Sequence, residues 1–224
     1  MKQTSYLYLQ THTTQILAYR GRVILFRLKN GGCAMLRHYV YRIDHDTGFA
    51  PHAAYGWCLL CGCKKTTIER WAEPGSWVVG IGGNNTKTAK DKLIYAMQVC
   101  STPSLAKLRR NTPRLTSYLR GHPKLDPASR VLVSRCFWYF GDRAQEPPRR
   151  LVYRGRNCKR LSDADVNRLL RFLSRMSRKG FKPGKLGQPN NCAPGRPVIC
   201  GCRRGNAVSH PARTSTASHR CERH

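Results

Sequence analysis

The sequence predicts an α+β fold in which a mostly antiparallel, barrel-like sheet packs against one amphipathic helix. Three observations predict it. Residues 38–43 alternate between two faces, as in a strand with one buried side. Two β-rich segments, residues 76–81 and 93–99, are joined by a polar loop and so predict a hairpin. Residues 163–179 instead repeat apolar side chains with the period of a helix.

The first expected strand, residues 38–43, has Tyr39, Tyr41 and Ile43 on one face, because successive side chains of a strand point to opposite sides. The Asp-Thr-Gly sequence at residues 46–48 then supplies a turn. Two short elements are expected before the hairpin. Residues 57–60 are an apolar run, and residues 66–71 have room for one or two helical turns before a Pro-Gly pair.

The hairpin loop, residues 82–90, is long enough to reach a ligand. After the hairpin, residues 102–129 are interrupted by Pro, Arg and Ser, which predicts short helical turns and loop. Residues 131–133 predict a strand that ends in an aromatic corner at residues 137–140.

The predicted helix 163–179 begins after Ser162, a good N-cap, and ends before Gly180. One of its faces is a stripe of leucines for the core. The opposite face carries four arginines, Arg168, Arg171, Arg175 and Arg178. Such a stripe is suited to a phosphate backbone, although a charged outer face is also ordinary for a surface helix.

The domain is expected to span residues 35–189. Residues 1–34 show no sustained period and are predicted to be a spurious or disordered extension before Met35. Residues 190–224 are poor in apolar side chains and are predicted to be a basic, disordered tail.

The chain is strongly basic, with a formal net charge of +30. The charge is uneven, because residues 101–224 hold 28 of the 41 Lys and Arg residues. Such a field attracts polyanions, although an Arg-rich composition also follows from a GC-rich coding sequence. Eleven cysteines, an odd number, without a secretory or membrane segment predict a reducing, cytoplasmic location.

The Gly-Ile-Gly-Gly sequence at residues 80–83 is neither a Rossmann fingerprint nor a P-loop, because it lacks the later Gly and the Gly-Lys-Ser/Thr. Gly80 and Gly82 would instead leave one strand face bare, either for a base or for close packing. The phrase Pro-Gly-Ser-Trp-Val-Val-Gly at residues 74–80 is similar to one in PUA- and EVE-like barrels that read bases. The candidate walls of a base pocket are aromatic, namely Tyr39, Phe49, Trp57, Trp77 and Tyr139.

Two other chemistries stay open. Asp46 and His52 flank the Gly-Phe-Ala-Pro turn and are the candidate acid and base of a nucleotide-modifying or nucleotide-processing enzyme, although capping the turn is an alternative role for Asp46. The spacing of Cys58, Cys61 and Cys63 is suited to half of a zinc site. No second pair has the expected spacing, so buried thiols are the preferred interpretation and a zinc-stapled interaction module is the alternative.

Three sequence pieces in order carry a family resemblance. They are HYVYRIDHDTGFAPHAAYGWCLLCGCKKTTIERWAEPGSWVVGIGG from residue 38, VLVSRCFWYFGDRAQEPPRRL from residue 131 and RFLSRMSRKGFKPGKLGQP from residue 171. Together they resemble the nucleotide modification associated domain 2 family, a bacterial and phage group linked to DNA-modification systems. The resemblance covers residues 35–189 and implies a function connected with nucleotide modification.

We therefore expect a nucleic-acid or nucleotide-binding domain that reads a modified base. No cofactor, metal or membrane contact is expected, and the sequence leaves the oligomeric state open. Phosphate would be held by the helix stripe and by lysines in or near the loops, namely Lys64, Lys65, Lys87, Lys90 and Lys92.

Overall fold

The computed structural model describes residues 36–62, 68–119, 125–155 and 157–191, together with the backbone of three strands within residues 1–34. These three strands form an antiparallel sheet and are β1 (Tyr8–Thr11), β2 (Thr14–Tyr19) and β3 (Arg22–Arg27). They lie where the sequence shows no sustained period. The Val-Ile-Leu-Phe run inside β3 is the local signal for them, because β-branched and aromatic residues suit a strand.

The domain is built on a six-stranded mixed sheet with the order β11-β4-β7-β8-β10-β12. Its strands are β4 (His38–Ile43), β7 (Trp77–Gly82), β8 (Leu93–Gln98), β10 (Cys136–Tyr139), β11 (Cys158–Leu161) and β12 (Gly184–Lys185). A second, three-stranded antiparallel sheet has the order β5-β6-β9. It contains β5 (His52–Ala54), β6 (Trp57–Leu60) and β9 (Leu132–Ser134).

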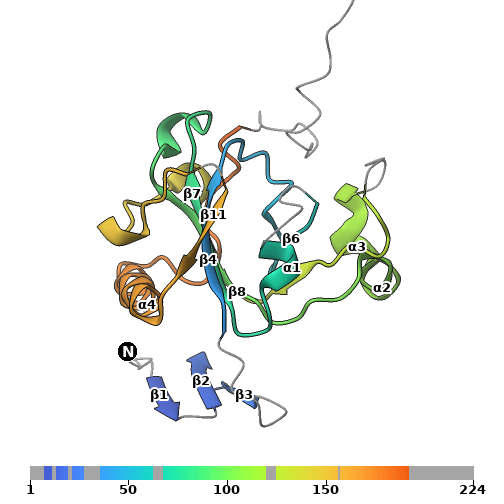
Figure 1. The fold of residues 1–224 in the computed structure, drawn as a ribbon, viewed down its shortest axis with the longest axis horizontal. Helices are drawn as coiled ribbons and strands as arrows, with labels where there is room; N and C mark the ends of the chain where they lie inside the picture. The colour runs from blue at the N-terminus through green and yellow to red at the C-terminus, as the bar shows by residue number, and fades with distance from the viewer. Residues whose placement is uncertain are drawn as a thin grey trace, which may run out of the picture.

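Helices cover both faces of the larger sheet (Figure 1). One face carries α4 (Asp163–Arg178), and the other carries the smaller sheet with α1 (Ile68–Trp71), α2 (Leu105–Asn111) and α3 (Pro113–Thr116). Four short 3-10 turns complete the described part, η1 (Lys87–Ala89), η2 (Ser117–Leu119), η3 (Gly141–Arg143) and η4 (Arg149–Leu151). None of the helices in this part of the chain is long and apolar enough to cross a lipid bilayer.

The α+β class and most expected elements are confirmed. The first strand is β4, the predicted hairpin is β7–β8, and the predicted helix is α4, which is capped by the Ser162 side chain. The alternate residues of β4 also face opposite sides of the sheet, as expected. Tyr39, Tyr41 and Ile43 face the core between the two sheets, whereas Val40 faces the core under α4.

The expected barrel is not found among the described residues. Strands β4 and β7 pair in parallel, because the chain between them crosses over through β5, β6 and α1. The two sheets therefore face each other as separate layers. The predicted aromatic corner also differs, because Phe137 to Tyr139 continue as strand β10. The chain leaves the smaller sheet after Ser134 and enters the larger one at Cys136, so the corner comes earlier than predicted.

His38, on β4, predicts a pH dependence of stability. Its buried Nδ1 accepts a hydrogen bond from the Trp77 backbone N–H at 2.9 Å, so the folded state holds the neutral ring. Burial lowers the pKa of His38, Arg160 lowers it further, and nearby Asp163 opposes the shift. Below the ordinary histidine pKa of about 6.5, His38 binds a proton in the unfolded chain but stays neutral in the folded chain.

The free energy of unfolding should therefore fall as the pH is lowered from about 7.5 to about 5.5. The variant His38→Asn keeps an acceptor near the position of Nδ1 but does not titrate. Its free energy of unfolding should therefore decrease less over this pH range. Urea unfolding at both pH values measures the difference. Equal losses in the two proteins would rule out this role for His38.

Candidate functional site

Four strands of the larger sheet run in one direction, so their carboxyl ends meet at one edge. These strands are β4, β7, β10 and β12, as the two parallel pairs and the shared antiparallel partner β8 require. The antiparallel strands β8 and β11 begin at the same edge. Ligands of open α/β sheets bind outside the carboxyl ends of parallel strands. This edge, which we call the polar rim, comprises residues 42–46, 83–92, 141–143, 153–154 and 188–191.

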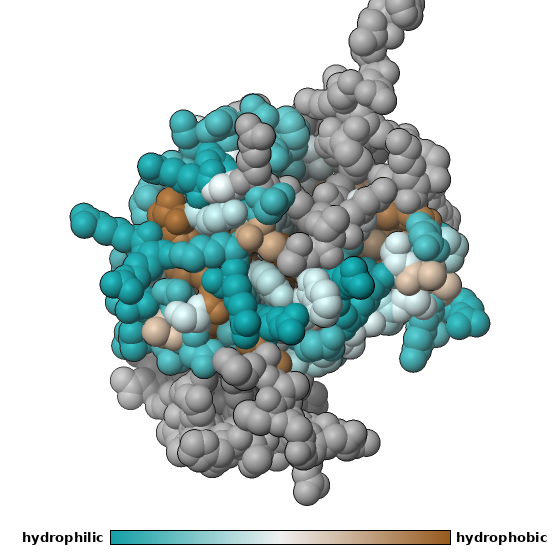
Figure 2. Space-filling model, in the orientation of Figure 1, coloured by the Kyte–Doolittle hydropathy of each residue, from teal (hydrophilic) through white to brown (hydrophobic). Residues whose placement is uncertain are grey.

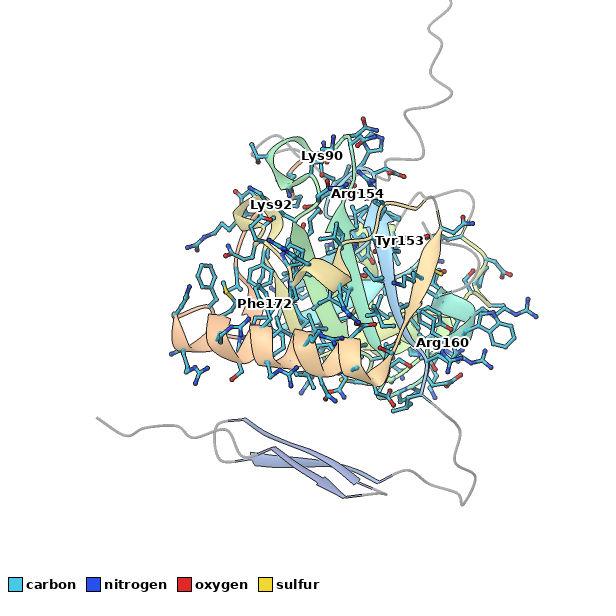
Figure 3. All side chains as sticks on the ribbon, turned by 60° about the vertical axis from the view of Figure 1, so that its left-hand side comes forward. Lys90, Lys92, Tyr153, Arg154, Arg160 and Phe172 are labelled. Atoms are coloured by element: carbon cyan, nitrogen blue, oxygen red, sulfur yellow. The ribbon has the colours of Figure 1, made fainter. Side chains whose placement is uncertain are left out.

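The polar rim carries a group of cationic side chains that we call the basic cluster, Arg42, Lys90, Lys92 and Arg154. Figure 3 shows Lys90, Lys92 and Arg154 toward the same end of the sheet, whereas Arg160 lies toward the other end of β11. In Figure 2 the surface over this end, where the η1 loop lies in Figure 1, is mostly hydrophilic.

Asp91 organises the basic cluster. Its carboxylate lies 3.7 Å from Arg42 Nη2 and 3.1 Å from Arg154 Nη2. Arg42 also donates to Asn84 Oδ1 at 3.0 Å and so ties β4 to the loop after β7. The side chain of Arg154 is 74% exposed, against 13% for Arg42. Arg42 is therefore the half-buried support, and Arg154 is the arginine that can reach a ligand.

Among the described residues, the two lysines of the basic cluster differ in whether they form an ion pair. Lys90 is exposed, while Lys92 lies 4.0 Å from Glu146 in a solvent-exposed ion pair, which is a weak interaction. Asp91 pairs with Arg42 and Arg154, and Glu146 pairs with Lys92, while Asp44, Asp46 and Asp142 are further acidic residues of the polar rim. The structure describes the backbone of Lys87 in η1 but not its side chain, and Lys64 and Lys65 lie outside the described residues.

Asp46 is a buried member of the polar rim and holds three parts of the chain together. Its Oδ1 accepts from the Tyr139 hydroxyl at 2.6 Å, and its Oδ2 accepts from the backbone N–H and side-chain amide of Asn190 at 3.1 and 3.0 Å. The Asp46 N–H donates to Asn191 Oδ1 at 2.7 Å, and its carbonyl accepts from the Asn191 N–H at 2.8 Å. The segment after β12 is thus fixed to the turn after β4.

The protonation of this group follows from its burial. Burial raises the pKa of the Asp46 carboxyl, and the hydrogen bonds from Tyr139 and Asn190 oppose that shift. Burial also raises the pKa of Tyr139 well above its ordinary value, so Tyr139 remains a donor. Both carboxylate oxygens are engaged by the chain itself, which is the arrangement of a structural anchor.

His52, the other catalytic candidate, is held by contacts with Gly48 and Tyr118. Its Nδ1–H donates to the Gly48 carbonyl at 2.7 Å, and its ring stacks on Tyr118 with the centroids 3.6 Å apart. Burial lowers its pKa. The chain's own groups thus engage the side chains of both Asp46 and His52, and their catalytic role stays a prediction.

The five candidate aromatic walls mostly lie in the core. Tyr39, Phe49, Trp77 and Tyr139 are buried, and Trp57 is half-buried. They also divide among three hydrophobic clusters, so the structure does not gather them around one cavity. The layers that cover the two faces of the larger sheet bury Tyr39, Trp77 and Tyr139.

The two candidate glycines allow close packing. A Cβ on Gly80 would meet the Tyr95 ring and the Ile43 side chain, and one on Gly82 would overlap the Ala89 carbonyl oxygen. The space beside each glycine is therefore filled by the chain. In the α4 stripe, Arg168 pairs with Asp165 at 3.0 Å, while Arg171, Arg175 and Arg178 are exposed on the helix.

Cys58, Cys100, Cys136 and Cys158 are free thiols, and the described residues contain no group of three or more side chains able to hold a metal. Cys58 and Cys61 are fully buried, and burial strongly raises the pKa of Cys58. Cys63, the third residue of the candidate zinc motif, lies outside the described residues.

Sequence reasoning missed Arg42, Asp91, Arg154, Asn190 and Asn191. No local sequence pattern points to these residues. Arg42 and Arg154, for example, are in contact although they are 112 residues apart in the sequence. The antiparallel pairing of β11 with β4 brings Arg154 to Arg42, and the antiparallel pairing of β8 with β7 brings Asp91 to the same end of the sheet.

The sequence model of the nucleotide modification associated domain 2 family matches residues 35–127, which confirms the resemblance over that stretch. Beyond residue 127, the resemblance stays a prediction. No curated protein and no solved structure matches this chain.

Proposed function

We propose that this chain, whose residues 35–127 match a family associated with nucleotide modification, binds nucleic acid or nucleotide at the polar rim. The observation that carries the proposal is the basic cluster at the carboxyl ends of β4 and β7. Arg42 and Asp91 hold Arg154 in an exposed position, next to the loop that carries Lys90. A guanidinium fork binds phosphate oxygens in a bidentate way, and a nearby ammonium adds a point charge.

The arginines of α4 are a second source of phosphate contacts. Arg171, Arg175 and Arg178 are exposed on one helix without a neighbouring acid on that face, since the acidic residues of α4 lie in its first turn. Contacts of this kind would fix the position of a nucleic acid without reading its sequence.

The modified base is the finer part of the proposal, and the family match supports it. We propose that the chain distinguishes a modified base from a plain one. The test is binding of the full chain to matched oligonucleotides with plain cytosine or 5-hydroxymethylcytosine, and plain adenine or N6-methyladenine. A preference that persists at high salt would support base reading, whereas equal affinities throughout would exclude it for these modifications.

We propose a cytoplasmic location for this function. Cys58 and the half-exposed Cys100, Cys136 and Cys158 are free thiols. Free thiols in number are typical of a reducing compartment.

The rim is tested by the double variant Lys90→Ala/Arg154→Ala. At about 0.15 M salt its affinity for an oligonucleotide should fall roughly tenfold, and the slope of log K against log salt should shrink by about 2, because two phosphate contacts are lost. Fluorescence anisotropy across a salt series measures both quantities.

Two further variants complete the test. Lys159→Ala/Lys182→Ala removes two exposed charges elsewhere and should change the affinity less than threefold. Arg171→Ala/Arg175→Ala removes two charges from α4. If the α4 variant lost affinity and the rim variant did not, the helix would be the binding surface and the rim proposal would be wrong.

A further inference from the structure

The tip of the β5–β6 hairpin has an unusual backbone. The register pairs Ala54 with Trp57, so the turn consists of Tyr55 and Gly56. Both have positive φ, 51° and 75°, which is the geometry of a type I′ turn. Asn-Gly is the favoured sequence there, and a bulky residue in the left-handed region is an outlier.

Tyr55 is also the most exposed large hydrophobic residue in the described part of the chain, with 59% of its surface accessible. An unfavourable conformation thus holds an aromatic ring in solvent at the end of a rigid hairpin. Conformational outliers of this kind cluster at functional positions, because the surrounding structure must maintain them.

Two arginines lie over the aromatic rings of this hairpin. The guanidinium carbon of Arg114 is 4.1 Å from the centre of the Tyr55 ring, and that of Arg135 is 3.9 Å from the centre of the Trp57 ring. Among the described residues, neither arginine lies within 4 Å of a carboxylate. We call Tyr55, Trp57, Arg114 and Arg135 the hairpin platform.

The surroundings of the hairpin platform are basic. Arg114 belongs to α3, which packs beside α2, and α2 carries Lys107, Arg109 and Arg110. Neither helix contains an acidic residue. Figure 1 shows both helices on the same side of the large sheet as β6, opposite α4. The platform is therefore separate from the arginine stripe of α4.

We propose that the hairpin platform stacks unpaired bases of a single-stranded nucleic acid. An exposed aromatic ring offers its face to any base, and the arginines add cation–π contacts and charge for the backbone. Bases inside a duplex are already stacked on their neighbours and do not present their faces. The positive surroundings favour a polyanion over an apolar or a basic protein partner.

This inference goes beyond the proposed rim, because it assigns a second surface and the strandedness of the partner. The two surfaces can be tested separately. The rim contacts phosphate and is measured by the salt slope, whereas the platform contacts base faces and is measured by stacking.

The experiment uses the full chain and oligonucleotides that contain one 2-aminopurine, whose fluorescence is quenched on stacking. Single-stranded DNA, single-stranded RNA and a DNA duplex of the same sequence are compared. The variant Tyr55→Asn removes the ring and supplies a residue that suits the turn, so the protein should remain folded. Tyr55→Phe keeps the ring.

With the wild-type protein and with Tyr55→Phe, we expect quenching on single strands. With Tyr55→Asn, quenching should be lost, the affinity for single strands should fall roughly tenfold, and the salt slope should be unchanged. A matched control, Trp71→Ala, removes another exposed aromatic that lies beside Arg37 and Arg70.

Three outcomes would overturn the inference. Undiminished quenching and affinity in Tyr55→Asn would show that the platform does not stack bases, as would a loss seen with Trp71→Ala alone. A preference for the duplex would exclude a single-stranded partner.

Loss of the salt dependence in Lys90→Ala/Arg154→Ala, with quenching retained, would support both surfaces. An unaffected salt slope there, with quenching lost in Tyr55→Asn, would support the platform alone.

Discussion

Replacing Asp46 by alanine should lower the free energy of unfolding by about 3 kcal/mol. The carboxylate accepts hydrogen bonds from the Tyr139 hydroxyl and from two N–H groups of Asn190. Alanine would leave these donors without their acceptor, and Tyr139 is fully buried, so water cannot replace it. An unsatisfied buried donor costs about 1–3 kcal/mol, which exceeds the gain from removing a buried charge.

Urea unfolding of three further variants separates the effect of the Tyr139 hydrogen bond from that of the Asp46 carboxylate and from that of removing any acidic side chain. Tyr139→Phe removes one donor and should cost about 1.5 kcal/mol. In Asp46→Asn, one oxygen becomes an NH2 group that faces donors, so this isosteric change should be nearly as harmful as alanine. Glu146→Ala removes a carboxylate whose side chain is 80% exposed and should cost less than about 0.5 kcal/mol. If Asp46→Ala were as mild as Glu146→Ala, Asp46 would not anchor the fold.

Replacing Gly82 by alanine should lower the free energy of unfolding by about 3 kcal/mol. The new Cβ would overlap the Ala89 carbonyl oxygen and lie 2.6 Å from its carbon. Since this neighbour is backbone, no side-chain rotation relieves the clash, and η1 must move. The shift would carry Lys90 with it, because Gly82 and Lys90 form a β-bridge. Oligonucleotide affinity should therefore fall together with stability.

Thr88→Ala is the control, because Thr88 is exposed in the same loop. It should change the stability by less than about 0.5 kcal/mol and leave binding unaltered. Thermal unfolding and anisotropy titration on the same preparations measure both effects. A stable Gly82→Ala protein with unchanged affinity would mean that the loop after β7 does not determine the geometry of the rim.

The parts of the fold that the sequence predicted correctly are those with local signals. β4 has a period of two residues, and α4 has a helical period and a capping serine. The parallel pairing of β4 and β7 has no such signal, because it depends on how the chain between them crosses over. The barrel prediction was wrong for this reason.

The residues of the candidate site also differ in whether a local sequence signal points to them. Lys90 and Lys92 were candidates because they lie in or near the loop after a recognisable glycine-rich strand, and their binding role stays a prediction. Arg42 and Arg154 become neighbours only in the folded sheet. Tyr55 was missed because Tyr-Gly is a weak turn signal beside Asn-Gly. Trp77 and Phe49 were candidate walls, but Trp77 packs in the cluster under α4 and Phe49 in the cluster with α2, β6 and β9.

The anchoring of Asp46 has a consequence for biosynthesis. Its partners Asn190 and Asn191 are 144 and 145 residues further along the chain. A nascent chain that has emerged from the ribosome only as far as β10 already contains Asp46 and Tyr139 but lacks these asparagines. Because domains generally fold as units, the two sheets should complete their packing only after the segment that follows β12 has been synthesised. Until then the Asp46 carboxylate lacks the two donors of Asn190, and we expect the incomplete domain to be a client of chaperones.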